Sequence, residues 1–248
     1  MYKNKLVLIF LGILFSVLLP AQVRYGYQIS PSVNWLSSSS PVINTNGAIL
    51  GVKSGVVFDI PVPAGQKFWF ISTGFMVHYN CGGVLSNQNP GKYWINSDLA
   101  ITADTFPKNT KLKYKLTYIE IPVGLKIGNL DWFYFESYAN IGFRRFAKGE
   151  ISGTSNLNQR KILLKKEINY FNFSFGVGCA YNIGRSFLDN DKMGPFVGLF
   201  YEIGLADITK NKGSYQYSPS YGTILENSKT VTNSIVLRIA FNLTDTND

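Results

Sequence analysis

The feature of this sequence that most constrains its fold is a strict alternation of apolar and small polar residues, seen first in RYGYQISPSVNW at residues 24–35. Successive side chains of a β-strand point to opposite faces, so this segment predicts a strand with one apolar and one polar face. Tyr25, Ile29 and Trp35 lie on the apolar parity, and Gln28 lies on the polar one. Taken alone, the pattern fits both a soluble β-sandwich and a β-barrel in lipid.

The first residues predict an export signal. Lys3 and Lys5 precede an apolar run over residues 6–19, and Pro20-Ala21 offers a cleavage site. The run has about 14 residues, fewer than the roughly 20 that a spanning helix needs, so we expect a cleaved signal peptide over residues 1–21. No later stretch has 18 uninterrupted apolar residues, which excludes a helical membrane protein.

The same alternation recurs along the chain. Each repeat is long enough for the roughly 9 to 11 residues with which a tilted strand crosses a bilayer. The clearest repeat covers residues 167–183, where large apolar residues on odd positions face asparagine, serine, glycine and alanine on even positions. The eight predicted strands cover residues 24–36, 46–61, 67–80, 112–128, 132–146, 167–183, 194–208 and 230–243.

The connections between these strands alternate in length, with short ones at residues 61–66, 129–131 and 184–193. The long ones lie at residues 81–111, 147–166 and 209–229. Outer-membrane barrels alternate short periplasmic turns with longer extracellular loops, and closure leaves no unpaired backbone in lipid. The sequence therefore predicts an all-β fold, an eight-stranded antiparallel up-and-down transmembrane β-barrel. We expect it to span residues 22–248 in the cell outer membrane, with both termini periplasmic.

Charged side chains of both signs lie on the inward parity of the predicted strands. Eight strands leave an interior that side chains fill, and buried charges are tolerated when they are paired. We therefore expect a polar network in the lumen in place of an open pore. The alternative is a proton or ligand site built from Glu120, Glu136, Glu202 and Arg238. The expected network consists of Lys53, Asp59, Glu120, Lys126, Glu136, Arg144, Glu202 and Arg238.

Little in the sequence indicates catalysis or metal binding. His78 is the one histidine, so a nucleophilic triad or a histidine metal site would have to use it, and no serine and carboxylate stand at a recognisable spacing from it. Cys81 and Cys179 are far apart and supply neither a disulfide framework nor a metal cluster. We expect no catalytic residue, no metal and no cofactor.

The formal net charge is +9, and much of it lies in or beside the predicted outer loops. Such a rim can pair with lipopolysaccharide phosphates or other acidic polymers, although ordinary solvated loop charge explains it equally well. Nucleic-acid binding has no support in an exported chain. The expected basic extracellular rim consists of Lys108, Lys111, Arg145, Lys148, Arg160, Lys161, Lys165 and Lys166.

Four segments carry a family resemblance: LTYIEIPVGLK at residues 116–126, the glycine-rich residues 175–182, GLFY at 198–201 and NSIVLR at 233–238. Together they resemble the PorT-like outer-membrane β-barrel family of Bacteroidetes. The resemblance covers residues 24–243 and implies the eight-stranded barrel. PorT itself is associated with type IX secretion and gliding. The resemblance fixes no activity, so we expect a non-enzymatic interaction or assembly module whose partners are outer-membrane lipid, lipopolysaccharide and other envelope or secretion proteins. A narrow channel for small solutes is the alternative, and an enzyme acting on lipid or peptide is a third hypothesis.

Overall fold

The computed structural model describes residues 23–62, 68–98, 105–130, 132–153, 159–184, 195–210, 214–218, 222–225 and 227–242. The predicted signal peptide, residues 1–21, lies outside the described residues. Across the described ranges, the structure has no helix that is both long and apolar enough to cross a membrane.

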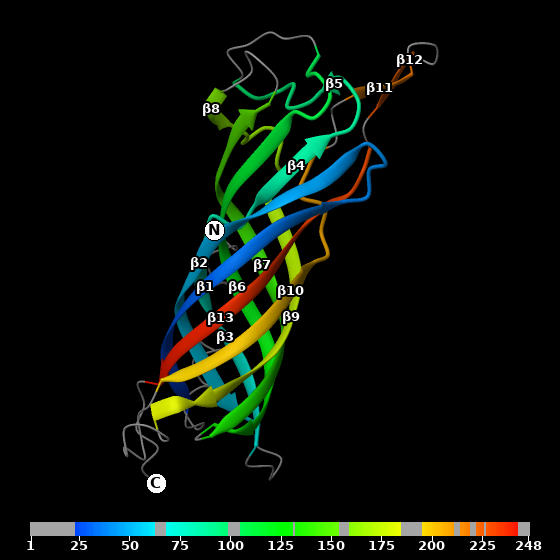
Figure 1. The fold of residues 1–248 in the computed structure, drawn as a ribbon. Coiled ribbons are helices and arrows are strands. Elements are labelled where there is room, and N and C mark those ends of the chain that lie inside the picture. Colours follow the sequence, from blue (N-terminus) through cyan, green and yellow to red (C-terminus); the bar gives the residue numbers. More distant parts are fainter. Residues whose placement is uncertain are drawn as a thin grey trace, which may run out of the picture.

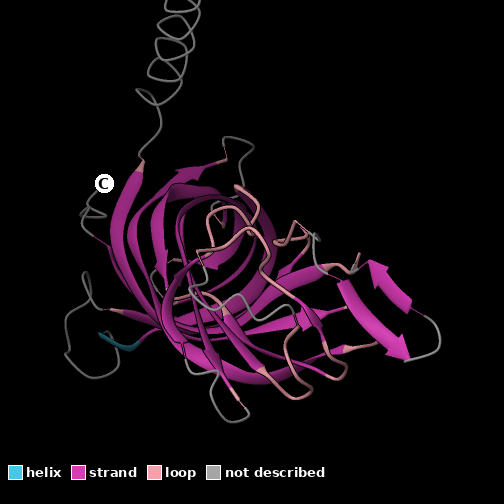
Figure 2. Ribbon diagram, turned by 90° about the horizontal axis from the view of Figure 1, so that it is seen from above, coloured by secondary structure: helices cyan, strands magenta, loops and turns pink. Residues whose placement is uncertain are grey.

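Eight long strands form a closed ring (Figures 1 and 2), in which each strand pairs antiparallel with its two neighbours. The ring closes where the start of β1 meets the end of β13, with Gly26 opposite Asn242. The predicted eight-stranded up-and-down barrel is therefore confirmed. In ring order, the strands are β1 (Arg24–Ser38), β2 (Ile43–Pro61), β3 (Trp69–Tyr79), β6 (Lys111–Asn129), β7 (Phe133–Ser152), β9 (Phe171–Asn182), β10 (Phe196–Gly204) and β13 (Thr230–Asn242).

The wall of the barrel is apolar outside and polar inside, as the alternation predicts. On β1, Tyr25 is 48% exposed and Ile29 is 40% exposed, whereas Gln28 and Ser32 on the opposite parity are only 2% and 3% exposed. Leu199 on β10 is 61% exposed. A continuous apolar exterior of this kind is stable in hydrocarbon and costly in water. We call this exterior the apolar belt.

The long connections contain further short strands that the alternation does not predict. β4 (Gly83–Asn87) pairs with both β2 and β6 above the end of β3. β8 (Gln159–Leu163) pairs with the extended end of β7. β5 (Gly91–Lys92), β11 (Ser214–Ser218) and β12 (Gly222–Leu225) form a small separate sheet. In Figure 1 all five strands lie at the upper end of the barrel.

Two predicted strands reach four residues beyond the observed ones at the distal end of the barrel. The prediction began one strand at residue 167, but β9 starts at Phe171. It also extended another strand to residue 208, but β10 ends at Gly204. The residues beyond these ends belong to a folded cap on the barrel, which we call the distal lobe. The distal lobe consists of residues 81–98, 105–116, 147–153, 159–170 and 205–210. Inside it lies an apolar core, whose members include Leu85, Trp94, Phe106, Leu112, Tyr114, Leu116, Ile151, Ile162, Leu164, Ile168 and Ile208.

Strand β6 shows where the barrel changes surroundings. At its distal end the inward residues are apolar, as at Leu112 and Leu116, and the outward ones are lysines, as at Lys113. Further along the strand the order reverses, with Ile119 outward and Glu120 inward. A charged exterior over an apolar core suits water, and the reverse suits lipid. The distal lobe therefore stands outside the membrane, and the apolar belt begins near Ile119.

Candidate functional site

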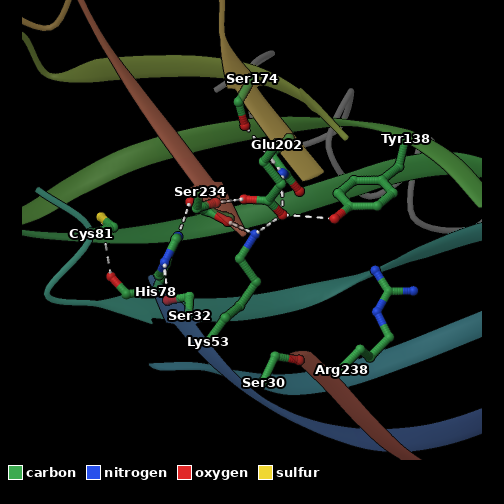
Figure 3. A network of polar contacts seen from close by, with 12 residues as sticks. Ser30, Ser32, Lys53, His78, Cys81, Tyr138, Ser174, Glu202, Ser234 and Arg238 are labelled. Carbon is green, nitrogen blue, oxygen red and sulfur yellow. Dashed lines mark hydrogen bonds and ion pairs between the residues drawn. The ribbon is translucent and has the colours of Figure 1, made fainter. Parts of the chain in front are cut away.

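The centre of the barrel interior holds a buried cluster that joins three strands. The ammonium of Lys53 on β2 lies 2.8 Å from Glu120 Oε2 on β6 and 2.5 Å from Glu202 Oε1 on β10. Figure 3 shows Lys53 reaching across the lumen toward Glu202. All three side chains are at most 5% exposed, so the ion pairs are shielded from water. One lysine thus holds two carboxylates from opposite parts of the wall together.

Hydrogen bonds from uncharged side chains complete the shell of Glu202. The Tyr138 hydroxyl donates to Oε1 over 2.8 Å, and the Ser234 hydroxyl donates to Oε2 over 3.1 Å. Asn140 Nδ2 also donates to Oε1 over 3.3 Å. Tyr138 has room to reach the carboxylate because Gly176 faces its ring, where an added Cβ would lie 2.4 Å from Tyr138 Cζ. Buried carboxylates need such donors, since unpaired ones are strongly destabilising.

A second group of charges lies nearer the end of the barrel that carries the short connections. Lys126 Nζ contacts both oxygens of Asp59, over 2.7 and 2.8 Å. Arg238 forms an ion pair with Glu136, and its guanidinium carbon lies 3.7 Å from the centroid of the Phe200 ring. The planar guanidinium can stack on an aromatic face while its N–H groups donate to a carboxylate.

The structure brings together seven of the predicted lumen residues and leaves Arg144 out. Lys53, Asp59, Glu120, Lys126, Glu136, Glu202 and Arg238 are all buried and paired inside the barrel. Arg144 instead donates to the main-chain oxygens of Lys165 and Ile168, so it fastens the distal lobe to the barrel. The assignment of Arg144 to the network was wrong. Arg144 does lie on the inward face, opposite the buried Tyr118, but at the level of the apolar lobe core and not at that of the lumen charges.

His78 has partners that its sequence spacing did not reveal. Its Nδ1 lies 3.2 Å from Glu120 Oε1, and its Nε2 lies 3.3 Å from Ser32 Oγ. A serine, a histidine and a carboxylate in this order form the arrangement that activates nucleophiles in hydrolases. Ser32 is 46 residues away from His78, and only closure of the barrel places them together. The sequence signal for Ser32 was its inward parity on β1.

The surroundings of this triad leave no room for a substrate. Ser32 and His78 are each 3% exposed, and the adjoining cavity measures about 10 Å³. Such a cavity holds about one water molecule. Glu120 also contacts Lys53, so its carboxylate is shared between the histidine and the lysine. The three groups lie within hydrogen-bond distance of one another in a closely packed, buried position.

A cluster of buried apolar side chains from the described residues lies at each end of the lumen. The core of the distal lobe covers one end, where Trp94 Nε1 donates to the Tyr114 hydroxyl over 2.8 Å. The other end holds a second apolar cluster that includes Phe70, Leu130 and Tyr134. Among the described residues, no three histidine, cysteine, aspartate or glutamate side chains gather where they could hold a metal ion.

The residues of the predicted basic rim are all exposed, but they do not form one site. Lys108, Lys111, Arg145, Lys148, Arg160, Lys161, Lys165 and Lys166 lie at the surface of the distal lobe and its junction with the barrel. Nearby, Lys115 Nζ lies 2.5 Å from Glu150 Oε1, and Lys113 Nζ lies 3.5 Å from Glu150 Oε2. Acidic residues thus offset part of the positive charge.

A closed ring of eight antiparallel strands, with an apolar exterior and a polar interior, defines an outer-membrane-type transmembrane β-barrel. No protein-family model and no curated protein sequence matches the chain.

Several solved outer-membrane proteins have similar structures. Ail, the attachment invasion locus protein of Yersinia pestis, in complex with the heparin analogue sucrose octasulfate, has a TM-score of 0.43 and 8% identity, covering 89% of this chain and 99% of Ail. Neisserial surface protein A has a TM-score of 0.39 and 10% identity, covering 88% of this chain and 95% of that one. The outer membrane protease OmpT of Escherichia coli has a TM-score of 0.35 and 9% identity, covering 90% and 95%.

Proposed function

We propose that this protein is a non-enzymatic interaction or assembly module of the outer membrane, and that the distal lobe is its contact surface. The observation that carries the proposal is the combination of a filled lumen with a folded lobe. Ion pairs occupy the centre of the barrel, and apolar clusters lie at both ends. Much of the chain outside the belt builds a lobe with its own apolar core. A barrel that conducts has no need of such a cap.

The orientation follows from the general design of such barrels, which place short turns in the periplasm and long connections outside. In this orientation the start of β1 and the end of β13 face the periplasm, and the distal lobe faces the exterior. The sequence resemblance to the PorT-like family makes the type IX secretion or gliding machinery our candidate assembly. The partners in that case are other envelope proteins.

Cross-linking from defined positions tests this proposal. A photo-reactive amino acid placed singly at Lys111 or Arg160 on the distal lobe should capture a discrete partner in intact cells. The same amino acid at Leu199, which faces lipid on the apolar belt, serves as the matched control and should capture none. Mass spectrometry identifies the captured protein. If the barrel is recovered alone from every lobe position, the interaction role is wrong.

A narrow channel is the second candidate, because a continuous row of charged and polar groups lines the lumen from Asp59 to Glu120. Its charges are paired across the lumen, and the two cavities beside them measure about 10 Å³ each. Recordings of the purified protein in planar bilayers separate the two roles. We expect no discrete conductance steps, and stable steps from the folded protein would favour the channel.

A further inference from the structure

The outer wall of the barrel is interrupted just above the end of β3. Asn80, which follows the strand, has a φ of 57°, and this left-handed turn ends the run of strand residues. The chain then passes so close to β6 that a Cβ on Gly82 would lie 2.0 Å from the Tyr114 carbonyl oxygen. β4 resumes the wall only at Gly83. The result is a groove of about 210 Å³ on the outside of the barrel, lined by Tyr79, Asn80, Lys115, Thr117, Phe146 and Lys148.

Strand register places this groove at the upper edge of the apolar belt. Thr117 on β6 lies opposite Tyr79 on one side and Phe146 on the other, so two exposed aromatic rings flank it. One step toward the membrane, Ile119 lies opposite Val77 and Phe143. Aromatic residues gather where hydrocarbon meets the headgroups of a membrane. The floor of the groove therefore lies at headgroup depth.

Two residues before Thr117 on β6, on the side away from the membrane, two lysines face each other. Lys115 lies directly opposite Lys148 in the ladder between β6 and β7. Like charges in this position repel and destabilise a sheet. Glu150 offsets only part of the repulsion, since it contacts Lys115 and Lys113. Within the part of the chain that the structure describes, Lys148 has no acidic partner. The groove thus carries excess positive charge beside an apolar surface.

We propose that this groove binds a phosphate on the headgroup of an outer-leaflet lipid. The ammonium groups of Lys115 and Lys148 contact the phosphate, and the acyl chains lie along Val77, Ile119 and Phe143. A lipid satisfies both halves of the site, whereas a soluble anion would leave the exposed apolar residues below the lysines uncovered. The inference goes beyond the interaction role of the distal lobe and depends on the orientation proposed above, with the lobe outside the cell.

Native mass spectrometry of the purified full chain tests this inference with lipid A as the probe. The protein is offered diphosphoryl lipid A, dephosphorylated lipid A or glucosamine phosphate, in a neutral detergent. We expect the diphosphoryl lipid to be retained, and the dephosphorylated lipid and the soluble phosphate to be retained at least tenfold less. Equal retention of both lipids would overturn the proposal. Stronger retention of glucosamine phosphate than of lipid would show a site for soluble anions and would also overturn it.

Charge variants locate the site. Lys115→Gln with Lys148→Gln should lower retention of diphosphoryl lipid A about tenfold, because each lysine near an anionic surface contributes a substantial favourable charge interaction. Glu150→Gln should raise it, because the competing carboxylate is removed. The matched control Lys165→Gln with Lys166→Gln removes the same charge elsewhere on the lobe and should leave retention unchanged. An equal loss in the control would mean diffuse attraction and would contradict a built site. Heat-dependent gel mobility verifies that each variant is folded.

These outcomes are independent of the cross-linking result, since a barrel without protein partners can still bind lipid phosphate. Loss of lipid retention in the double-glutamine variant with unchanged cross-linking from Arg160 would support both proposals separately. Unchanged lipid retention in that variant would remove only the lipid site.

Discussion

At the scale of single residues, Lys53 is the cation on which the centre of the lumen depends. It contacts Glu120 and Glu202, and both carboxylates are nearly inaccessible to water. Replacing one partner of a buried ion pair costs about 3–5 kcal/mol, because the remaining charge is left uncompensated. We expect Lys53→Met to lower the free energy of unfolding by at least this amount, measured by urea titration in lipid vesicles.

The variant series around Lys53 includes its own controls. Lys53→Met combined with Glu120→Gln and Glu202→Gln removes the uncompensated charges and should recover much of the loss. Lys108→Met, on the exposed surface of the distal lobe, should change the free energy of unfolding by less than about 0.5 kcal/mol. Unchanged stability in Lys53→Met alone would show that the lumen charges are hydrated and do not form a structural network.

Ser32 gives a second prediction at this scale. Its hydroxyl lies 3.3 Å from His78 Nε2, yet Ser32 is only 3% exposed, and the cavity beside His78 measures about 10 Å³. We expect a fluorophosphonate probe, which labels activated serines, to leave the folded protein unlabelled. Labelling of the wild type that disappears in Ser32→Ala would instead reveal an accessible nucleophile and contradict the non-enzymatic role.

The lumen residues were predictable from parity, but their contacts were not. Parity along a strand determines whether a side chain faces inward, and this placed Glu136 and Arg238 inside correctly. Which inward side chains contact one another depends on the stagger between strands. This stagger brings Ser32 to His78, which is 46 residues away in the sequence. Arg144 was placed in the wrong group because parity gives the face of a side chain but not the level along the barrel at which the polar lumen ends and the lobe core begins.

At the scale of single elements, β6 passes from water at its distal end into the hydrocarbon of the membrane. Its outward residues change from lysines to isoleucines and valine along a single parity, and its inward residues change from leucines to charged and small ones. Both changes are visible in the sequence. The prediction used the alternation only to find the strand, so it missed the point where the strand leaves the membrane.

Paired substitutions on β6 test this division. Val123 faces outward near the middle of the apolar belt and is 49% exposed. A lysine at the bilayer midplane costs about 2–4 kcal/mol, so Val123→Lys should lower the free energy of unfolding from vesicles by that amount. Lys113→Val, outward on the same strand but above the belt, should have little effect. Equal effects of the two substitutions would mean that the wall faces one solvent throughout.

Glu150 on the extended end of β7 predicts a pH dependence. Its hydrogen bond with Lys115 lowers the pKa of this carboxyl below the ordinary value of 4.5. The stabilisation is therefore complete above pH 4.5 and is lost as the pH falls through the lowered pKa. We expect Glu150→Gln to unfold at a slightly lower temperature than the wild type at neutral pH, and the difference to vanish in acid. The effect is small, because exposed pairs contribute little. A difference that persists below the lowered pKa would exclude this ion pair as its cause.

At the scale of the whole molecule, the ring of strands was predictable and the distal lobe was not. The alternation and the loop lengths predict strand number, order and closure, because a transmembrane sheet has to pair both of its edges. The lobe depends on contacts between segments far apart in the sequence, such as Trp94 with Tyr114 and Asn169 with Ile208. Such contacts carry no periodic signal along the chain.

The most direct test of this account is the solvent in which the barrel folds. The chain from residue 22 onward, unfolded in urea, is diluted either into plain buffer or into lipid vesicles, and folding is followed by heat-dependent gel mobility. We predict a compact, heat-modifiable band in vesicles alone, because the exposed apolar belt has to be covered by hydrocarbon. A folded, soluble monomer in plain buffer would contradict the account.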